Sequence, residues 1–163
     1  MLLASAICSC SEKQPETTEP MITKTEIQVE NGQFTPEIMH RLGKVGDVQV
    51  SPDHSKILYG VTYTSIEQNK GNRELYLMNV DGSENVKITN TPKSESNARW
   101  LSDSQIIYMR SGKLYTATIE GTTLKNETEI AGAEGMESFE LSPAGDKLMF
   151  IKSVKAAQKP TDI

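Results

Sequence analysis

The fold of this chain is decided by the stretch Val50-Ser51-Pro52-Asp53-His54-Ser55-Lys56-Ile57-Leu58-Tyr59, a tight turn followed by an apolar strand. Two further copies of the pattern follow, at residues 100–108 and 141–150. Asp53 and Asp103 hold the same turn position 50 residues apart, and Ala144 follows 41 residues later. Ser, Pro and Asp suit successive positions of a type I turn, because Ser hydrogen-bonds the turn backbone and Pro fixes φ. The chain therefore repeats one turn-and-strand unit three times.

A second pattern repeats in step with the first. Residues 75–83 match residues 114–122, 39 residues later. The two copies end in Asp81-Gly82 and Glu120-Gly121, which supply the positive φ that a tight hairpin turn requires. A period of about 40 residues, with several short strands in each period, is typical of β-propeller blades.

Continuous apolar runs predict strands that are covered on both faces, since a strand with one solvent-exposed face would alternate apolar and polar residues. The runs occupy residues 75–78, 106–109 and 148–151. Their short length and their Gly, Pro, Asp and Ser boundaries favour strands over helices. We expect strands near 46–50, 57–63, 74–79 and 86–89, then 96–100, 105–110, 113–119 and 127–131, and finally 136–140 and 147–152. The predicted fold is all-β: an incomplete β-propeller of about two and a fraction four-stranded blades.

The chain is interpreted as truncated in the third blade. Its last residues, Asp162-Ile163, align with Glu74-Leu75 at the start of a third strand. A blade cannot close a ring alone, so we expect the chain to be part of something larger.

One short helix is predicted before the first blade, from Pro36 to Leu42. Thr35 suits the N-cap, Pro36 the first helical position and Gly43 a C-terminal stop. Ile38, Met39 and Leu42 form an apolar stripe. The stripe either packs onto the domain or docks a partner domain.

The N-terminus is similar to the end of an export signal. An apolar run at residues 1–7, too short to span a bilayer, precedes Cys8-Ser9-Cys10. This arrangement resembles the lipobox of bacterial lipoproteins, and Cys10 fits it better than Cys8 because a small residue precedes Cys10. We expect Cys10 to be lipidated and the protein to be exported, as a periplasmic or outer-membrane lipoprotein whose only contact with the membrane is its lipid. An ordinary signal peptide with incidental cysteines is the alternative.

Four segments follow from these patterns. Residues 1–10 are the truncated signal peptide and lipobox, and residues 11–26 a flexible tether. Residues 27–45 hold an N-terminal strand and the helix, and residues 46–163 the partial propeller.

Composition and residue chemistry exclude several kinds of site. The net charge of −5 and the absence of a basic stripe argue against nucleic-acid binding. A Cys/His zinc site cannot be assembled, because the chain has two histidines and no cysteine after residue 10. Ser51, Asp53 and His54 lie on one turn, whereas a Ser-His-Asp triad needs groups that converge from separate elements. There is also no G-x-S-x-G elbow. We therefore expect no catalytic residue, metal or cofactor here.

Three segments carry a family resemblance: Thr35-Pro36-Glu37, residues 42–53 and residues 72–83. They resemble the N-terminal portion of prolyl oligopeptidase family serine peptidases, of the bacterial acylaminoacyl-peptidase and dipeptidyl-peptidase-like branch. The resemblance runs from about Thr35 to Ile163. It implies a propeller that precedes an α/β-hydrolase domain with a Ser-Asp-His triad, and it places no active-site residue on this chain. The turn and hairpin motifs are shared with TolB-like propellers.

Two functions are consistent with this resemblance. The first is the N-terminal propeller segment of an exported serine peptidase, which controls the access of short peptides to a C-terminal α/β-hydrolase domain absent here. The second is a TolB-like, non-catalytic periplasmic propeller that binds protein partners. A G-x-S-x-G elbow downstream of Ile163 would favour the peptidase.

Overall fold

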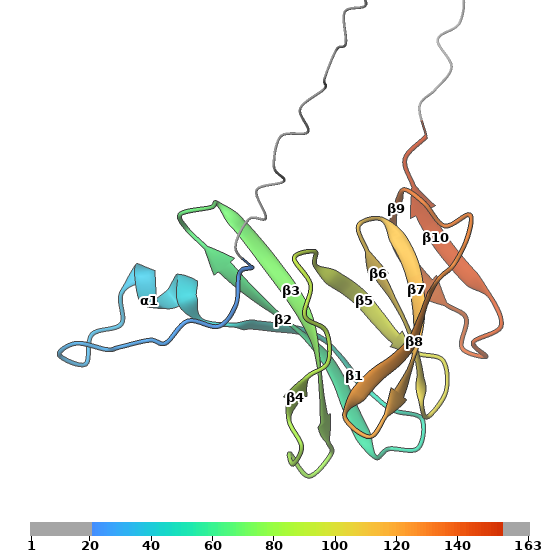
Figure 1. The fold of residues 1–163 in the computed structure, drawn as a ribbon, viewed down its shortest axis with the longest axis horizontal. Helices are drawn as coiled ribbons and strands as arrows, with labels where there is room; N and C mark the ends of the chain where they lie inside the picture. Colours follow the sequence, from blue (N-terminus) through green and yellow to red (C-terminus); the bar gives the residue numbers. More distant parts are fainter. Residues whose placement is uncertain (1–20, 155–163) are drawn as a thin grey trace, which may run out of the picture.

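The structure is a computed structural model that describes residues 21–154. Within that range the chain forms one short helix and three antiparallel sheets (Figure 1). The first sheet has the order β1 (Lys44–Val50), β2 (Lys56–Ser65), β3 (Lys70–Asn79), β4 (Val86–Lys87). The second has the order β5 (Glu95–Trp100), β6 (Gln105–Arg110), β7 (Lys113–Glu120), β8 (Thr123–Glu129). The third pairs β9 (Met136–Leu141) with β10 (Leu148–Lys152).

Each sheet is a meander in which every strand pairs with its neighbour in sequence. The ten expected strands are present, and most begin and end within two or three residues of the prediction. The largest differences are at β3 and β8, which start at Lys70 and Thr123 and not near 74 and 127. Both strands begin earlier because they pair with the preceding strand right up to the hairpin turn. The first pairs after the turns are Ser65–Lys70 and Glu120–Thr123.

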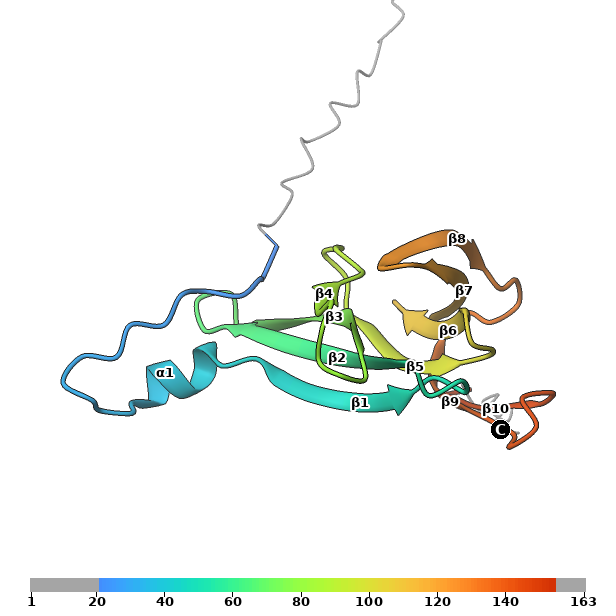
Figure 2. The same cartoon turned by 90° about the horizontal axis from the view of Figure 1, so that it is seen from below.

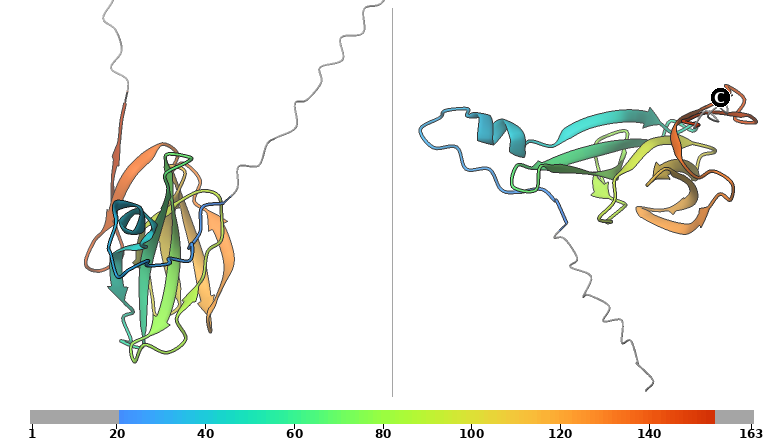
Figure 3. Two further views of the ribbon diagram at one scale, coloured as in Figure 1. Left: turned by 90° about the vertical axis from the view of Figure 1, so that its left-hand side faces the viewer. Right: turned by 90° about the horizontal axis from the view of Figure 1, so that it is seen from above.

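The three sheets follow one another in space, with the helix at one end and β9–β10 at the other, and they form no closed barrel within the described residues. Figure 2 shows this order from below, and the right-hand view of Figure 3 shows it from above.

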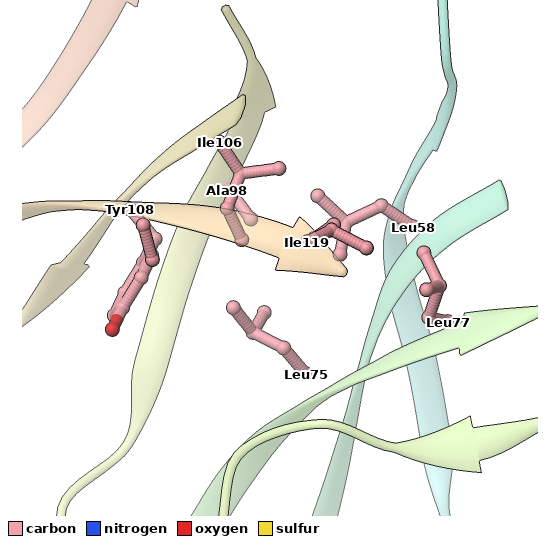
Figure 4. Packing of buried hydrophobic residues seen from close by; sticks show 8 residues of the cluster. Leu58, Leu75, Leu77, Ala98, Ile106, Tyr108 and Ile119 are labelled. Atoms are coloured by element: carbon pink, nitrogen blue, oxygen red, sulfur yellow. The ribbon is translucent and has the colours of Figure 1, made fainter. Parts of the chain in front are cut away.

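Two hydrophobic clusters join the sheets. Leu58, Leu75 and Leu77 of the first sheet meet Tyr108 and the other inward side chains of the second (Figure 4). A second cluster joins the second and third sheets and includes Phe139. Its other buried members are Ile107, Met109, Leu114, Ala133 and Met136.

The apolar run at residues 106–109 is covered on both faces, as predicted. Ile106 and Tyr108 point into the first cluster, whereas Ile107 and Met109 point into the second. β6 is therefore the strand that both clusters share.

The same prediction is wrong for the run at residues 148–151. Leu148 packs against the second cluster, but Met149, Phe150 and Ile151 are 67%, 51% and 57% exposed. Among the described residues, β9 is the only strand that pairs with β10, and no further sheet covers the outer face of this pair.

The helix α1 (Pro36–Arg41) has the predicted start. Thr35 is the N-cap, and its hydroxyl accepts a hydrogen bond from the Ile38 N–H at 3.3 Å. The predicted stop is wrong: Leu42 ends the helix in an extended conformation, with ψ of 136°, before Gly43 is reached. Gly43 has a packing role instead, because a Cβ there would lie 2.7 Å from the Val61 side chain.

No strand precedes α1 among residues 21–35, contrary to the N-terminal strand expected within 27–45. The backbone turns there, with the Gln33 N–H donating to the Glu30 carbonyl at 3.2 Å, and does not pair with a sheet edge. Residues 21–154 contain no helix of the length and apolarity needed to cross a membrane. Cys10 and the proposed signal segment lie outside the described residues.

Candidate functional site

The turn at residues 51–55, which holds a serine, an aspartate and a histidine, is a structural turn. The Ser51 hydroxyl donates to Asp53 at 2.6 Å and accepts the Lys56 N–H at 2.9 Å. The Asp53 carboxylate also accepts the N–H and the hydroxyl of Ser55, at 3.1 and 2.8 Å. The Ser51 hydroxyl, followed by the Ser55 donors, lowers the pKa of Asp53 to about 2. Because Asp53 binds the two serines, these residues do not form an Asp-His-Ser relay.

The third repeat builds the same turn. Ser142 contacts Asp146 at 2.8 Å and accepts the Lys147 N–H at 3.1 Å, as Ser51 does for Lys56. Gly145, with φ of 71°, stands where the first repeat has His54, with φ of 60°. The shared geometry shows that these residue patterns serve the fold.

The other motifs considered for chemistry are also structural. Asp81 accepts the N–H and the hydroxyl of Ser83 at 2.9 and 2.6 Å, which closes the hairpin turn. His40 lies in the last turn of α1, where a cation is favourable. In the part of the chain that the structure describes, no three His, Cys, Asp or Glu residues gather closely enough to hold a metal ion.

Two tyrosine pairs occupy equivalent positions in the two four-stranded sheets. Tyr59 and Tyr76 face each other across β2 and β3, with ring centroids 5.6 Å apart and ring planes at 25°. Tyr108 and Tyr115 do so across β6 and β7, at 5.9 Å and 21°. The second pair faces the first sheet, and Tyr108 is completely buried in the cluster between them.

The first pair lies on the opposite side of its sheet from the first cluster. Tyr59 alternates with Leu58, which belongs to that cluster, so the two side chains point to opposite faces. We call the side that carries Tyr59 the tyrosine face of the first sheet. Placed by the strand register, its other apolar and aromatic residues are Val45, Val50, Ile57, Val61, Tyr63, Tyr76 and Met78, and the buried polar residues Asn72 and Glu74 lie on the same face.

The tyrosine face is uncovered at β1. Val45 is 63% and Val50 50% exposed. In the second sheet, the corresponding side is buried against a neighbouring sheet. The tyrosine face therefore has the composition of a surface that packs against another sheet.

A buried polar network lies where residues 88–94 connect the first two sheets. Glu74 of β3 is 3% exposed and Glu95 of β5 is 0% exposed. The Glu74 carboxylate accepts hydrogen bonds from the Asn72 amide and the Thr91 N–H, both at 3.0 Å, and from the Thr89 hydroxyl at 2.7 Å. Burial raises the pKa of Glu95 to about 7; the Thr91 hydroxyl opposes this change and the Glu74 carboxylate adds to it.

Sequence reasoning missed this network. One signal was available: Glu74 lies in the same strand as the apolar run at residues 75–78 and directly precedes it. A charged residue in a buried strand needs partners nearby. Two of the partners, Thr89 and Thr91, lie in the connection after β4, which has no regular secondary structure, so no strand or turn pattern in the sequence points to them.

Comparisons with known proteins relate this chain to peptidases. No protein-family model matches the chain. Dipeptidyl-peptidase 5 of Porphyromonas gingivalis is 31% identical over 133 residues, which cover 80% of this chain and 19% of that protein. Dipeptidyl-peptidase 5 of Porphyromonas endodontalis is 26% identical over 143 residues, covering 85% of this chain and 20% of that protein. The chain thus spans about a fifth of the length of the curated relatives it matches. These similarities identify a peptidase-related protein.

Proposed function

We propose that this chain forms the first blades of a β-propeller in an exported serine peptidase. The propeller would control the access of short peptides to a separate α/β-hydrolase domain. The two relatives named dipeptidyl-peptidase 5 support the peptidase part of the proposal.

The observation that carries the propeller part is the recurrence of one sheet design. Two four-stranded meanders of the same strand order pack against each other, and each presents a stacked tyrosine pair at the same register. A third meander begins with β9 and β10 and repeats the Ser-Pro turn. Radial repetition of four-stranded sheets is the architecture of a propeller.

The geometry of residues 21–154 supports placing the catalytic chemistry elsewhere in the protein. The serine that a triad would need at the first turn is hydrogen-bonded into that turn, and no base is aligned with it. A serine peptidase needs a nucleophile, an aligned base and an oxyanion hole. The proposal therefore assigns the chemistry to residues outside this chain, and access control and binding surface to the sheets.

The test is to express the complete open reading frame and to treat the purified product with a fluorophosphonate probe. The expected result is labelling of a single serine outside residues 1–163, together with cleavage of short peptide substrates. Ser51→Ala is the matched control: it removes the serine of the first turn and should leave labelling intact. A full-length product that is unlabelled and inactive, and that consists of further blades, would instead indicate a TolB-like binding protein.

The proposal includes export through a lipid anchor at Cys10. Cys10→Ala is expected to abolish lipid attachment in the complete protein, whereas Cys8→Ala should not. Mass spectrometry of the mature N-terminal peptide distinguishes the two variants. A free thiol at Cys10 in the mature protein would rule out lipidation there while leaving the peptidase proposal untouched.

A further inference from the structure

The junction between the first two sheets contains two buried carboxyl groups in different hydrogen-bonding situations. Glu74 has three donors, on Asn72, Thr89 and Thr91, which is the environment of an ionised carboxylate. Glu95 is completely buried, and its Oε2 atom has no hydrogen-bond partner in the described part of the chain. An ionised carboxylate left in that state is costly. The neutral acid is the form that the site of Glu95 accommodates.

A count of protons at Thr91 leads to the same result. The Thr91 hydroxyl lies 2.6 Å from the Lys93 carbonyl and 2.7 Å from Glu95 Oε1. Both oxygens are acceptors when Glu95 is ionised, but a hydroxyl has one proton to donate. Both contacts become hydrogen bonds when Glu95 carries a proton and donates it to the Thr91 oxygen. The geometry therefore fits a protonated Glu95.

The cation beside Glu95 is shared with another carboxylate. On β6, the Arg110 guanidinium forms an ion pair with Glu95 Oε1 at 3.6 Å, beyond hydrogen-bond distance, whereas it donates a hydrogen bond to Glu127 of β8 at 3.1 Å. The hydroxyl of Tyr108, also on β6, donates to the same Glu127. From β3, the neighbour is the Glu74 carboxylate, which repels a charge on Glu95.

We propose that Glu95 is a proton-binding site that latches the first sheet to the second, with Glu74 as its anionic neighbour. With the proton bound, Glu95 bonds Thr91 and the connection 88–94 stays packed against β3 and β5. When the O–H bond breaks, the proton passes to solvent and its electron pair stays on Glu95, so two carboxylates face each other in a dry junction. Their repulsion loosens the connection.

The pH window follows from the raised pKa of Glu95. The folded value of about 7 lies above the ordinary value of 4.5, so the latch is complete below about pH 4.5 and weakens as the pH rises through about 7. This difference corresponds to a loosening of roughly two orders of magnitude in the opening equilibrium.

Hydrogen exchange on the full chain at pH 5.5 and 8.0, corrected for intrinsic rates, tests the latch. Wild type is expected to lose protection in residues 86–100 by about 30-fold at the higher pH, since only part of the full loosening falls between pH 5.5 and 8.0. Glu95→Gln keeps the shape of the acid and a donor for Thr91, so its protection should not change with pH. Glu129→Gln makes the same substitution at an exposed site on β8 and should behave as wild type.

Infrared spectroscopy of the wild-type protein gives a second measurement that needs no variant to fold. A protonated-carboxyl band present at pH 5.5 and lost as the pH rises through about 7 supports the latch. Equal pH dependence in wild type and Glu95→Gln, or the absence of that band at pH 5.5, would overturn it.

Discussion

Position 60 is expected to need glycine because the Arg73 side chain lies across it. Gly60 is in the middle of β2 and pairs with Gly46 of β1. A Cβ on Gly60 would be 2.3 Å from Arg73 Nε, a distance that real Cβ atoms do not show. The guanidinium is held there by Asp47, at 2.9 Å, and by the Thr62 hydroxyl, at 3.3 Å. Gly60→Ala must therefore displace Arg73 from both partners.

The magnitude can be worked out from these contacts. The Arg73 and Asp47 side chains are 16% and 39% exposed, which makes their ion pair worth about 1 kcal/mol. The bond to Thr62 adds about 1 kcal/mol. Alanine in a strand recovers roughly 0.5–1 kcal/mol relative to glycine. Gly60→Ala should therefore lower the free energy of unfolding by about 1–1.5 kcal/mol.

A double-mutant cycle isolates the cause. Arg73→Ala alone is expected to cost about 2 kcal/mol. In the Arg73→Ala background, Gly60→Ala should stabilise by about 0.5–1 kcal/mol, because the obstacle is gone. Pulse proteolysis across a urea series, at a protein concentration low enough to limit self-association, measures all four proteins. If Gly60→Ala costs the same in both backgrounds, within about 0.5 kcal/mol, the clash with Arg73 is not the reason for glycine.

Three further substitutions test other features. His54 has φ of 60°, so His54→Gly should stabilise by about 0.5 kcal/mol and raise the melting temperature, whereas His54→Ala should not; a lower melting temperature for the glycine variant would contradict this. Because the pKa of Asp53 falls from 3.8 to about 2, its stabilisation is present above about pH 4 and is lost as the pH falls towards 2. Circular dichroism should show that Asp53→Asn lacks this acid-dependent step; an identical acid profile would count against it. Phe150→Lys should reduce self-association in sedimentation velocity, while Phe34→Lys, at a more exposed site outside the sheets, should change little.

The sequence predicted the strands well because local chemistry determines them. The Ser-Pro-Asp turn and the Asp-Gly hairpin specify their own hydrogen bonds within five residues, and the structure contains those bonds. The helix start was predictable for the same reason, since the Thr35 cap acts within its own turn.

Features that depend on distant residues could not be predicted in this way. The role of Gly43 depends on Val61, and that of Gly60 depends on Arg73, each in another strand or connection. The surroundings of Glu95 depend on Glu74, which lies in the first sheet and approaches only when the two sheets pack. They also depend on Arg110, its cross-strand partner on β6. The apolar run at 148–151 illustrates this from the other side. Its sequence pattern predicts that both faces of the strand are buried, but one face can be buried only by a neighbouring sheet.

The sharing of β6 by two clusters has a consequence for how the molecule unfolds. Each sheet is stabilised by its nearest neighbours, so the array behaves as a short one-dimensional chain of coupled units. The middle unit has two interfaces and the terminal unit β9–β10 has one, so amide protection should decrease from β6 towards β10. Closing such an array into a ring would give every unit two interfaces. No end unit would then unfold before the others, and the whole ring would unfold in one cooperative transition.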